Sequence, residues 1–474
     1  MYKVLSGIVL VLIFLFVLPE QASMEQASQE VRFQDEQLEQ ALKQILKKEN
    51  TAAITQQDME SLTLVDLSNR GIESIEGLQH ASNLTYLDLS RNEIKDIMPL
   101  KPLAKIRELD ITGNQITSIQ DLSALTDMEM LIVNRNQISS IDVIMQLGRL
   151  HTFEANDNQI SNIKALSTAT ELTWLQMNGN QITNIQPLSG LTKLKNLELA
   201  SNQISDLSPL KSLSKSLRSL DIGNNGISDL SALEGMTLME SLSAENNQIK
   251  KLDPLKKMSN LSSLNLNSNL VYNLEPLKSL SELHNLYLED NRVWNLDPIR
   301  NHTFNPPHYD TGAIRYSLQL SGNYLDLRNT TKTYQLLNKL GGDGSTFSQL
   351  KAQRLVIGSK TAYVGERSFA LSVAPFIESS RTYVPIRFVS ERLGSKVEWN
   401  QSKKEVTISK DNTTIRMKMN SKTASVNGKS VSLDAPLLLK KNSSFVPVRF
   451  ISEFLGSPVE YMANPKTVIV FEQK

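Results

Sequence analysis

Residues 84–94 read Leu84-Thr85-Tyr86-Leu87-Asp88-Leu89-Ser90-Arg91-Asn92-Glu93-Ile94, and this pattern recurs along most of the chain. An asparagine marks each recurrence, every 22 residues apart from one gap of 23 between Asn202 and Asn225. These asparagines are Asn92, Asn114, Asn136, Asn158, Asn180, Asn202, Asn225, Asn247, Asn269 and Asn291. A degenerate unit with Arg70 in the asparagine position precedes them, and a displaced unit around Asn323 follows. The sequence therefore predicts 12 repeats of L-x-x-L-x-L-x-x-N-x-L.

This pattern is the leucine-rich repeat, and it predicts an α/β solenoid. Leucines at positions one, four and six of each unit point inward from a short strand. One unit cannot bury these side chains alone, so neighbouring units must stack into a continuous core. The asparagine follows the strand, where backbone groups would otherwise be buried without partners. Because its amide both donates and accepts, we expect a structural asparagine ladder between adjacent coils.

The side chains between the buried leucines, at positions three, five and seven, are expected on the concave side of the array. Large apolar groups at these positions cannot belong to the core if the register is right. Met130, Ile132 and Trp174 meet this condition within two coils, and acidic side chains border them. Scattered exposed apolar side chains are normal, however, so this patch has an ordinary explanation too. The predicted ligand-binding residues are Tyr86, Asp88, Asp110, Met130, Ile132, Glu154, Trp174 and Glu198.

The first 60 residues predict a secretion signal followed by a cap. Lys3 and the apolar run Val4–Leu18 are typical of a signal peptide, assigned to residues 1–27, with an uncleaved membrane anchor as the alternative. Either reading places the rest of the protein outside the cytoplasm. Residues 28–60 predict a helical cap, with Leu38, Leu42, Ile45 and Leu46 on one helix face. Thr55-Gln56-Gln57-Asp58 resembles a capping box that starts a second helix.

The cap and the repeats resemble those of Gram-positive internalin-type proteins. The cap residues that carry the resemblance are Phe33, Asp35, Leu38-Glu39, Ala41, Ile54-Thr55 and Asp58, directly before the first repeat. Within the repeats, residues 202–210 read Asn-Gln-Ile-Ser-Asp-Leu-Ser-Pro-Leu, as in that family. The resemblance implies an extracellular recognition scaffold with repeats over residues 61–328. A helix and a glycine-rich linker are expected over residues 329–350.

A second internal duplication, with an offset of 62 residues, begins after the linker. Tyr383-Val384-Pro385-Ile386-Arg387-Phe388 returns as Phe445-Val446-Pro447-Val448-Arg449-Phe450, and residues 393–399 match residues 455–461. Each half predicts strands, one short helix stopped by Gly394 or Gly456, and a closing hairpin. Arg387 with Glu391, and Arg449 with Glu453, are spaced for helix ion pairs, although a binding role is the alternative.

Residues 351–474 form a small duplicated α+β domain that resembles the copper amine oxidase N-terminal-like, or stalk, domain. The chain's five histidines all precede this domain, and the chain has no cysteine. The usual copper ligands are therefore missing. The resemblance implies an appended module without oxidase chemistry, and we expect no metal and no cofactor.

Sequence motifs for catalysis are also missing. The chain contains no G-x-S-x-G elbow, no phosphate-binding glycine loop and no H-E-x-x-H, so no catalytic residue is predicted. His302, His308 and Asp310 are possible metal ligands, but their spacing matches no established site, which favours a surface loop.

The sequence leaves two classes of function, and the uneven distribution of charge along the chain bears on both. Residues 351–474 hold 20 Lys and Arg against 10 Asp and Glu, whereas the whole chain is neutral. The sequence favours a secreted or envelope-associated, non-catalytic binding protein whose repeat face recognises a protein or a glycan. The alternative is a structural envelope component, in which the repeats are a spacer and the basic domain holds anionic cell-wall polymer. A nucleic-acid partner is not expected, and membrane contact is expected only through an uncleaved signal segment.

Overall fold

A computed structural model describes residues 29–306, 308–310, 313–315, 317–328, 330–342, 351–463 and 465–473. The chain divides into two compact units, with the boundary after Gln203. The predicted signal segment lies outside the described residues, as does most of the glycine-rich linker. Within the described residues, none of the helices combines the length and the apolar character that a membrane crossing requires.

The cap consists of two helices, α2 (Glu36–Ile45) and α3 (Gln56–Glu60). Leu38 and Leu42 on α2 are fully buried. Thr55 and Asp58 form the predicted capping box at the start of α3. Gly77 in the first coil has a φ of 109°, and an added Cβ would lie only 2.6 Å from the ring of Phe33. A glycine is therefore required where the cap meets the first coil.

The repeats build one 12-stranded parallel sheet with the strands in sequence order. Its strands are β1 (Leu64–Asp66), β2 (Tyr86–Asp88), β3 (Glu108–Asp110), β4 (Met130–Ile132), β5 (Thr152–Glu154), β6 (Trp174–Gln176), β7 (Asn196–Glu198), β8 (Ser219–Asp221), β9 (Ser241–Ser243), β10 (Ser263–Asn265), β11 (Asn285–Tyr287) and β14 (Leu318–Gln319). Each three-residue strand of the array buries its central residue and leaves both flanking residues partly or fully exposed. The predicted register of the repeat is therefore confirmed.

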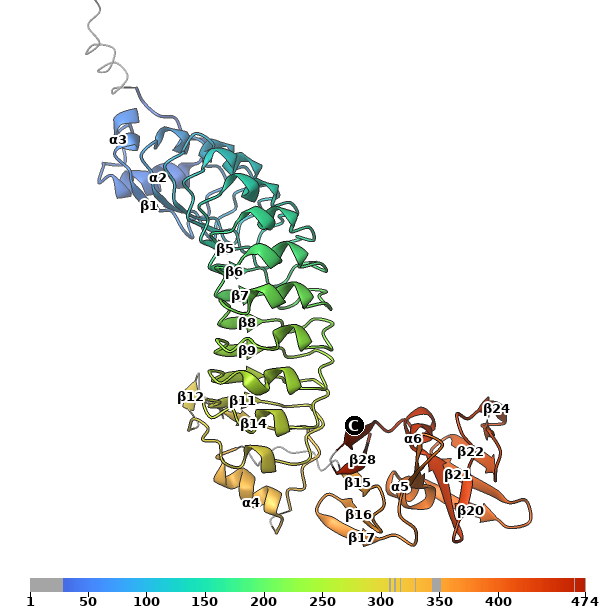
Figure 1. The fold of residues 1–474 in the computed structure, drawn as a ribbon. Coiled ribbons are helices and arrows are strands. Elements are labelled where there is room, and N and C mark those ends of the chain that lie inside the picture. Colours follow the sequence, from blue (N-terminus) through green and yellow to red (C-terminus); the bar gives the residue numbers. More distant parts are fainter. Residues whose placement is uncertain are drawn as a thin grey trace, which may run out of the picture. The chain divides into compact units, whose positions relative to one another are not determined.

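A short 3₁₀ helix closes most coils on the side away from the strands (Figure 1). These helices are η1 (Leu78–His80), η2 (Met98–Leu100), η3 (Gln120–Ala124), η4 (Asp142–Gln146), η5 (Lys164–Thr168), η6 (Gln186–Gly190), η7 (Ser208–Leu213), η8 (Ser231–Leu233), η9 (Asp253–Lys257), η10 (Glu275–Leu277) and η11 (Asp297–Ile299). A 22-residue coil leaves room for only one or two tight turns here, which a 3₁₀ helix supplies.

The repeated asparagines lie inside the turn that follows each strand. The Asn92 Oδ1 accepts from the backbone N–H of Ile72, and its Nδ2 donates to the carbonyls of Leu67 and Leu89. The same set of bonds recurs one coil later at Asn114. Each amide thus satisfies buried backbone groups of its own coil and of the preceding one. Arg70, in the asparagine position of the first coil, instead extends to Gln44 of the cap.

The array becomes irregular after Asn291. The strands β12 (His308–Asp310) and β13 (Ala313–Arg315) pair as a small antiparallel ribbon, where a surface loop is expected from the sequence. The array then resumes with β14, which pairs with β11. The helix α4 (Lys332–Lys339) follows, and the Glu366 carboxylate accepts from the N–H groups of Lys332 and Thr333 in its first turn.

The C-terminal domain holds three antiparallel sheets and two short helices, α5 (Ile386–Arg392) and α6 (Val448–Phe454). Its strands are β15 (Ala352–Val356), β16 (Thr361–Val364), β17 (Arg367–Ala370), β18 (Phe376–Glu378), β19 (Arg381–Pro385), β20 (Lys396–Asn400), β21 (Glu405–Lys410), β22 (Thr413–Lys418), β23 (Thr423–Val426), β24 (Lys429–Ser432), β25 (Leu438–Lys440), β26 (Ser443–Pro447), β27 (Val459–Ala463) and β28 (Lys466–Phe471).

The two halves of this domain are interleaved. One five-stranded sheet has the order β17-β16-β15-β28-β27, and the other has the order β20-β21-β22-β23-β24. Strands of both halves therefore share each of these sheets. The third sheet joins the halves again, since β19 pairs with β26. Side chains from both halves, including Val384 and Val446, form one buried core.

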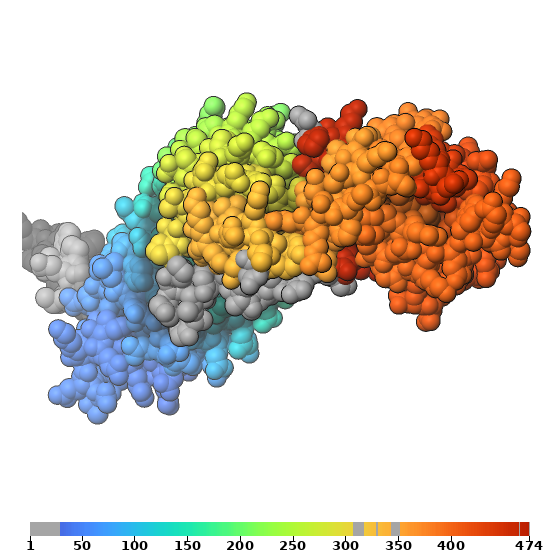
Figure 2. Space-filling model, turned by 90° about the horizontal axis from the view of Figure 1, so that it is seen from below, coloured from blue at the N-terminus to red at the C-terminus, as the bar shows by residue number. Residues whose placement is uncertain are grey.

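Within the second unit, the last coils contact the C-terminal domain (Figure 2). The Glu460 carboxylate lies 2.9 Å from the Lys250 Nζ and 3.2 Å from the Arg292 Nη1. The Arg354 guanidinium lies between the rings of Trp294 and Tyr363, at 4.6 and 4.7 Å from their centroids. Ion pairs and cation–π contacts thus connect the last coils with this domain.

Candidate functional site

The strand face of the first unit carries two parallel rows of side chains. Repeat position three aligns Glu108, Met130, Thr152, Trp174 and Asn196 on consecutive strands. Repeat position five aligns Asp110, Ile132, Glu154, Gln176 and Glu198 in the same register. The central residue of each strand is buried, so both rows belong to the outer face. We call these two rows the strand face.

An apolar patch lies in the middle of the strand face. Met130, Ile132 and Trp174 are each half-buried, whereas Leu131 and Phe153 between the rows are fully buried. Met130 and Trp174 are two strands apart, about 10 Å at the usual strand spacing. The structure therefore brings together the three apolar residues that the sequence singles out, outside the core.

Carboxylates border the apolar patch. Ile132 lies between Asp110 and Glu154 in its row. Gln176 separates Glu154 from Glu198, and its Nε2 donates to the Glu198 Oε1 at 3.0 Å. A uniformly polar strand face would favour a spacer, but this face is apolar at its centre and acidic at its edges.

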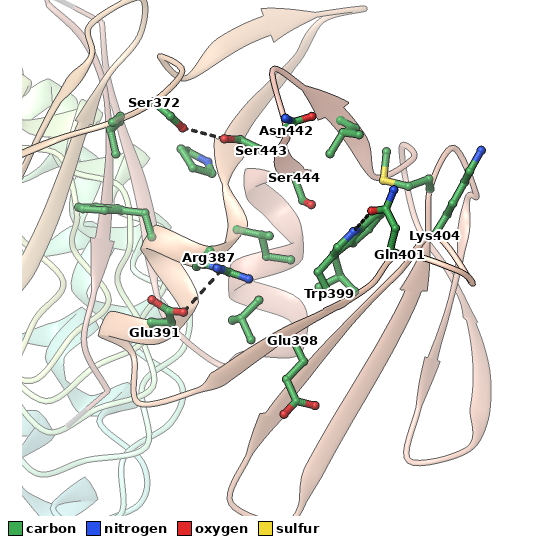
Figure 3. Close-up of a pocket in the computed structure, with 18 of the residues that line it drawn as sticks. Ser372, Arg387, Glu391, Glu398, Trp399, Gln401, Lys404, Asn442, Ser443 and Ser444 are labelled. Atoms are coloured by element: carbon green, nitrogen blue, oxygen red, sulfur yellow. Dashed lines mark hydrogen bonds and ion pairs between the residues drawn. The ribbon is translucent and has the colours of Figure 1, made fainter.

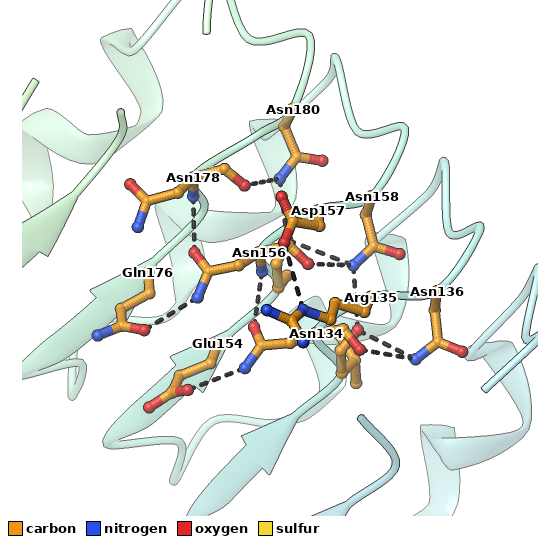
Figure 4. Close-up of polar contacts among 12 residues, drawn as sticks. Asn134, Arg135, Asn136, Glu154, Asn156, Asp157, Asn158, Gln176, Asn178 and Asn180 are labelled. Carbon is orange, nitrogen blue, oxygen red and sulfur yellow. Dashed lines mark hydrogen bonds and ion pairs between the residues drawn. The ribbon is translucent and has the colours of Figure 1, made fainter. Parts of the chain in front are cut away.

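A second ladder of asparagines, at repeat position seven, holds these acidic side chains (Figure 4). The Oδ1 atoms of Asn134, Asn156 and Asn178 each accept from the backbone N–H at the same position of the next coil, at 2.7 Å. The Nδ2 of Asn134 donates to Glu154 at 3.0 Å, and that of Asn178 donates to Glu198 at 2.8 Å. Hydrogen bonds therefore fix both carboxylates in place, which limits the side-chain entropy that binding would cost.

The strand face changes character toward the cap, where repeat position five holds aspartate. The Asp88 Oδ1 accepts from the N–H of Ser90, and the Asp110 Oδ1 accepts from the N–H of Thr112, both at 2.8 Å. Burial raises the pKa of Asp110, and the charge of Asp88 raises it further. Burial also raises the pKa of Tyr86, with a contribution from Asp88. The predicted residues Tyr86, Asp88 and Asp110 thus form an acidic end of the strand face.

Trp174 contributes one unsatisfied donor. Its Nε1 is buried and finds no acceptor among the described residues. A buried N–H without an acceptor costs free energy in the unbound protein. The indole is therefore positioned by packing and not by a hydrogen bond.

The structure groups no three His, Cys, Asp or Glu side chains in a metal-binding arrangement among the residues that it describes. A ring nitrogen of His302 lies 3.1 Å from the Leu277 carbonyl oxygen, and burial lowers its pKa. The side chains of His308 and Asp310 lie outside the described part. Neither a metal nor a cofactor is assigned to any residue here.

The second ladder was missed in the sequence, although a signal for it exists. Asn134, Asn156 and Asn178 each precede a ladder asparagine by two residues, so Asn-x-Asn recurs with the 22-residue period. Only the first asparagine of each pair reaches the strand face. The asparagines at repeat position seven of three consecutive coils are the sequence signal for this ladder.

Comparisons with known proteins agree with this architecture. The family "Copper amine oxidase N-terminal domain" matches residues 350–400 and 363–470. Leucine-rich repeat families match residues 80–97, 170–212 and 215–257. A primary amine oxidase of Klebsiella aerogenes is 31% identical over 77 residues. These residues are 16% of this chain and only 10% of that enzyme, so the chain spans about a tenth of its length.

Solved structures of internalins are similar to this chain. An internalin (inlF) from Listeria monocytogenes is 29% identical, with a TM-score of 0.60, over 65% of this chain and 87% of that chain. Internalin C2 from the same organism is 33% identical, with a TM-score of 0.42, over 45% of this chain and 94% of that chain. The chain is therefore a leucine-rich repeat protein with internalin-like structural neighbours. Its C-terminal part matches the copper amine oxidase N-terminal domain family.

Proposed function

We propose that this chain is a secreted, non-catalytic binding protein that holds a protein partner on the strand face of strands β2–β7. The observation that carries the proposal is the patch of Met130, Ile132 and Trp174, bordered by Asp110, Glu154 and Glu198. Apolar anchors surrounded by polar groups are typical of interface hot spots.

The border of the patch indicates the chemistry of the partner. Amide donors hold Glu154 and Glu198, and neither carboxylate forms an ion pair within the part of the chain that the structure describes. Their charge thus remains available to a partner, and a basic protein segment with one large apolar side chain fits this surface best. Because the ladder already orients both carboxylates, less side-chain entropy is lost on binding.

The proposed location outside the cytoplasm rests on the amino-terminal sequence. Lys3 followed by the apolar run Val4–Leu18 has the charge and length of a secretion signal. The structural similarity to an internalin supports the same proposal. Attachment to the cell envelope would need a further contact, which the proposed function does not require.

A random-peptide phage library panned against the full-length protein tests this function. The test variant combines Trp174→Ala with Ile132→Ser. The matched control combines Met98→Ala with Met145→Ala, which removes exposed apolar side chains from the coils' opposite side. Enriched peptides should be basic and carry an aromatic or aliphatic residue. They should bind the test variant more weakly by about 2 kcal/mol or more, and the control normally.

A variant without the two border charges distinguishes the contribution of the apolar patch to binding from that of its acidic border. Glu154→Gln with Glu198→Gln keeps the acceptor oxygens of the ladder and removes both charges. This variant should fold normally and lose most of the salt-dependent part of the peptide affinity. Peptides that bind the Trp174→Ala, Ile132→Ser variant as tightly as the original protein would rule out the strand face as the binding site.

A further inference from the structure

The C-terminal domain contains an open cleft of about 850 Å³ that the strand-face function does not use (Figure 3). Both halves of the duplicated domain line it. Arg387 and Trp399 come from the first half, on α5 and β20, whereas Met419 and Asn442 come from the second half. The interleaved sheets therefore create the cleft, since neither half supplies its walls alone.

Trp399 forms the central apolar surface of the cleft. The ring is half-buried, and its Nε1 donates to the Gln401 Oε1 at 2.6 Å. Because this donor is already satisfied, the indole offers a ligand its apolar surface and not a hydrogen bond. Val397 and Met419, both half-buried, extend this surface along the wall.

Groups that donate and accept hydrogen bonds face Trp399 across the cleft. Asn442, Ser443 and Ser444 lie on that side, and the Ser443 hydroxyl lies 2.7 Å from the hydroxyl of Ser372. The Arg387 guanidinium lies 3.7 Å from the Glu391 carboxylate at one end. The cleft thus combines one aromatic wall with neutral amides and hydroxyls, and its charges are of both signs.

We propose that this cleft binds an oligosaccharide, with Trp399 as the stacking surface. A sugar ring presents an apolar C–H face to an aromatic ring and hydroxyl groups around its edge. Each hydroxyl both donates and accepts, as do Asn442 and Ser444. The volume of the cleft is within the range of ordinary ligand sites.

The charges and the polar rim disfavour other classes of ligand. Three cations, Arg387, Arg392 and Lys404, line the cleft beside the carboxylates of Glu391 and Glu398. Arg387 faces Glu391, and Arg392 stacks on the ring of Phe388, so two of these cations are already engaged within the protein, which disfavours an anionic polymer. An alkyl chain would leave the amides and hydroxyls of the rim without partners. A short peptide is the remaining competitor, and it is one arm of the test.

The duplication supplies an internal comparison. At the offset of 62 residues, Tyr461 takes the place of Trp399, and Ala463 takes the place of Gln401. The second half therefore lacks the amide that holds the indole. Tyr461 is 44% exposed, so it can be replaced without opening the core. Tyr461→Ala is the matched control for Trp399→Ala.

The experiment is isothermal titration of the full-length protein with cellotetraose, maltotetraose, xylotetraose and the tetramer of N-acetylglucosamine. At least one of these probes should bind. The affinity of that probe should fall at least tenfold in Trp399→Ala and remain unchanged in Tyr461→Ala. The Trp174→Ala, Ile132→Ser variant should bind the sugar normally, because the inference does not depend on the strand-face function.

Trp399 also packs against the domain core, so its replacement can unfold the domain. Gln401→Ala with Asn442→Ala removes only exposed side chains and should weaken the same probe at least tenfold in a folded protein. The proposal is wrong if no tetrasaccharide binds at up to about 10 mM. It is also wrong if Tyr461→Ala weakens binding as much as Trp399→Ala, or if random tetrapeptides occupy the cleft and sugars do not.

Discussion

Asn180 shows how a single side chain joins two coils. Its Oδ1 accepts from the Ile160 N–H at 2.9 Å, and its Nδ2 donates to the Ala155 carbonyl at 2.8 Å and to the Met177 carbonyl at 3.2 Å. The side chain is 7% exposed. No other residue type of similar size supplies a donor and an acceptor with this geometry.

Asn180→Ala should destabilise the protein by about 1–3 kcal/mol, because it leaves buried backbone groups without partners. The measurement is urea unfolding followed by circular dichroism. Gln181→Ala changes an exposed neighbour of the same chemistry and should leave the midpoint unchanged. Equal midpoints for Asn180→Ala and Gln181→Ala would contradict a structural role of the ladder.

Asp110 is expected to make stability depend on pH in a defined direction. Burial, reinforced by the charge of Asp88, raises its pKa above the ordinary value of 3.8. A raised pKa in the folded state means that ionisation of Asp110 destabilises the fold as the pH rises through that pKa. Asp110→Asn should therefore raise the melting temperature at pH 7, and this gain should disappear below about pH 4.

Asp66 occupies the same repeat position on β1, but its pKa is shifted in the opposite direction, so it is the control for Asp110. Hydrogen bonds from the side chain and the backbone of Ser68 lower its pKa. Its carboxylate therefore stabilises the fold at neutral pH, and this contribution is lost as the pH falls through the lowered pKa. Asp66→Asn should not raise the melting temperature at pH 7. A gain in both variants would show that the pKa of Asp110 does not govern the effect.

At the scale of elements, one side chain, that of Asp35, forms hydrogen bonds with both the cap helix α2 and the first coil. The Asp35 Oδ1 accepts from the N–H of Gln37 and Leu38 at the start of α2. Its Oδ2 accepts from the N–H of Glu73 and Ser74 in the first coil. Burial alone would raise the pKa of Asp35, but these four backbone hydrogen bonds together lower it. One carboxylate thus starts the helix and joins it to the repeats.

Asp35→Ala should cost about 0.5–2 kcal/mol at pH 7, the usual range for loss of a helix N-cap. Because the folded-state pKa is lowered, the carboxylate stabilises the protein above its ordinary pKa. This contribution is lost as the pH falls through the lowered value. The difference between Asp35→Ala and the original protein, followed by urea unfolding, should therefore shrink at acidic pH. Gln40→Ala, on the exposed side of α2, should show no such difference at either pH.

At the scale of the whole molecule, the C-terminal domain is one folding unit built from two similar sequences. The strand β21 of the first half pairs with β22 of the second half, and β15 of the first half pairs with β28 of the second. Since strands of both halves complete each five-stranded sheet, separating the halves would expose unpaired strand edges.

A protease site inserted in the full-length protein at the turn Asp411–Asn412, between β21 and β22, tests this arrangement. After cleavage, the two fragments should remain together in size-exclusion chromatography and separate only in denaturant. Uncleaved protein is the control. Fragments that separate under native conditions would mean that each half folds as its own unit and does not share sheets with the other half.

The sequence by itself determined the repeat architecture, because a 22-residue period allows only one way to stack its buried leucines. It also determined which residues leave the core. Met130, Ile132 and Trp174 fall at repeat positions whose register the burial of Leu131 and Phe153 confirms. The resemblance to internalins and to the copper amine oxidase N-terminal domain is likewise carried by local motifs.

Only the tertiary structure decided how side chains of different coils and halves meet. The second ladder depends on a hydrogen bond from Asn134 of one coil to Glu154 of the next coil. The spacing between neighbouring strands brings these two side chains together, and the sequence of a single repeat does not show this contact. The duplicated sequence predicts two similar halves but does not indicate which half supplies each neighbouring strand. Such pairings join residues far apart in the chain, so the cleft beside Trp399 exists only once both halves have folded together.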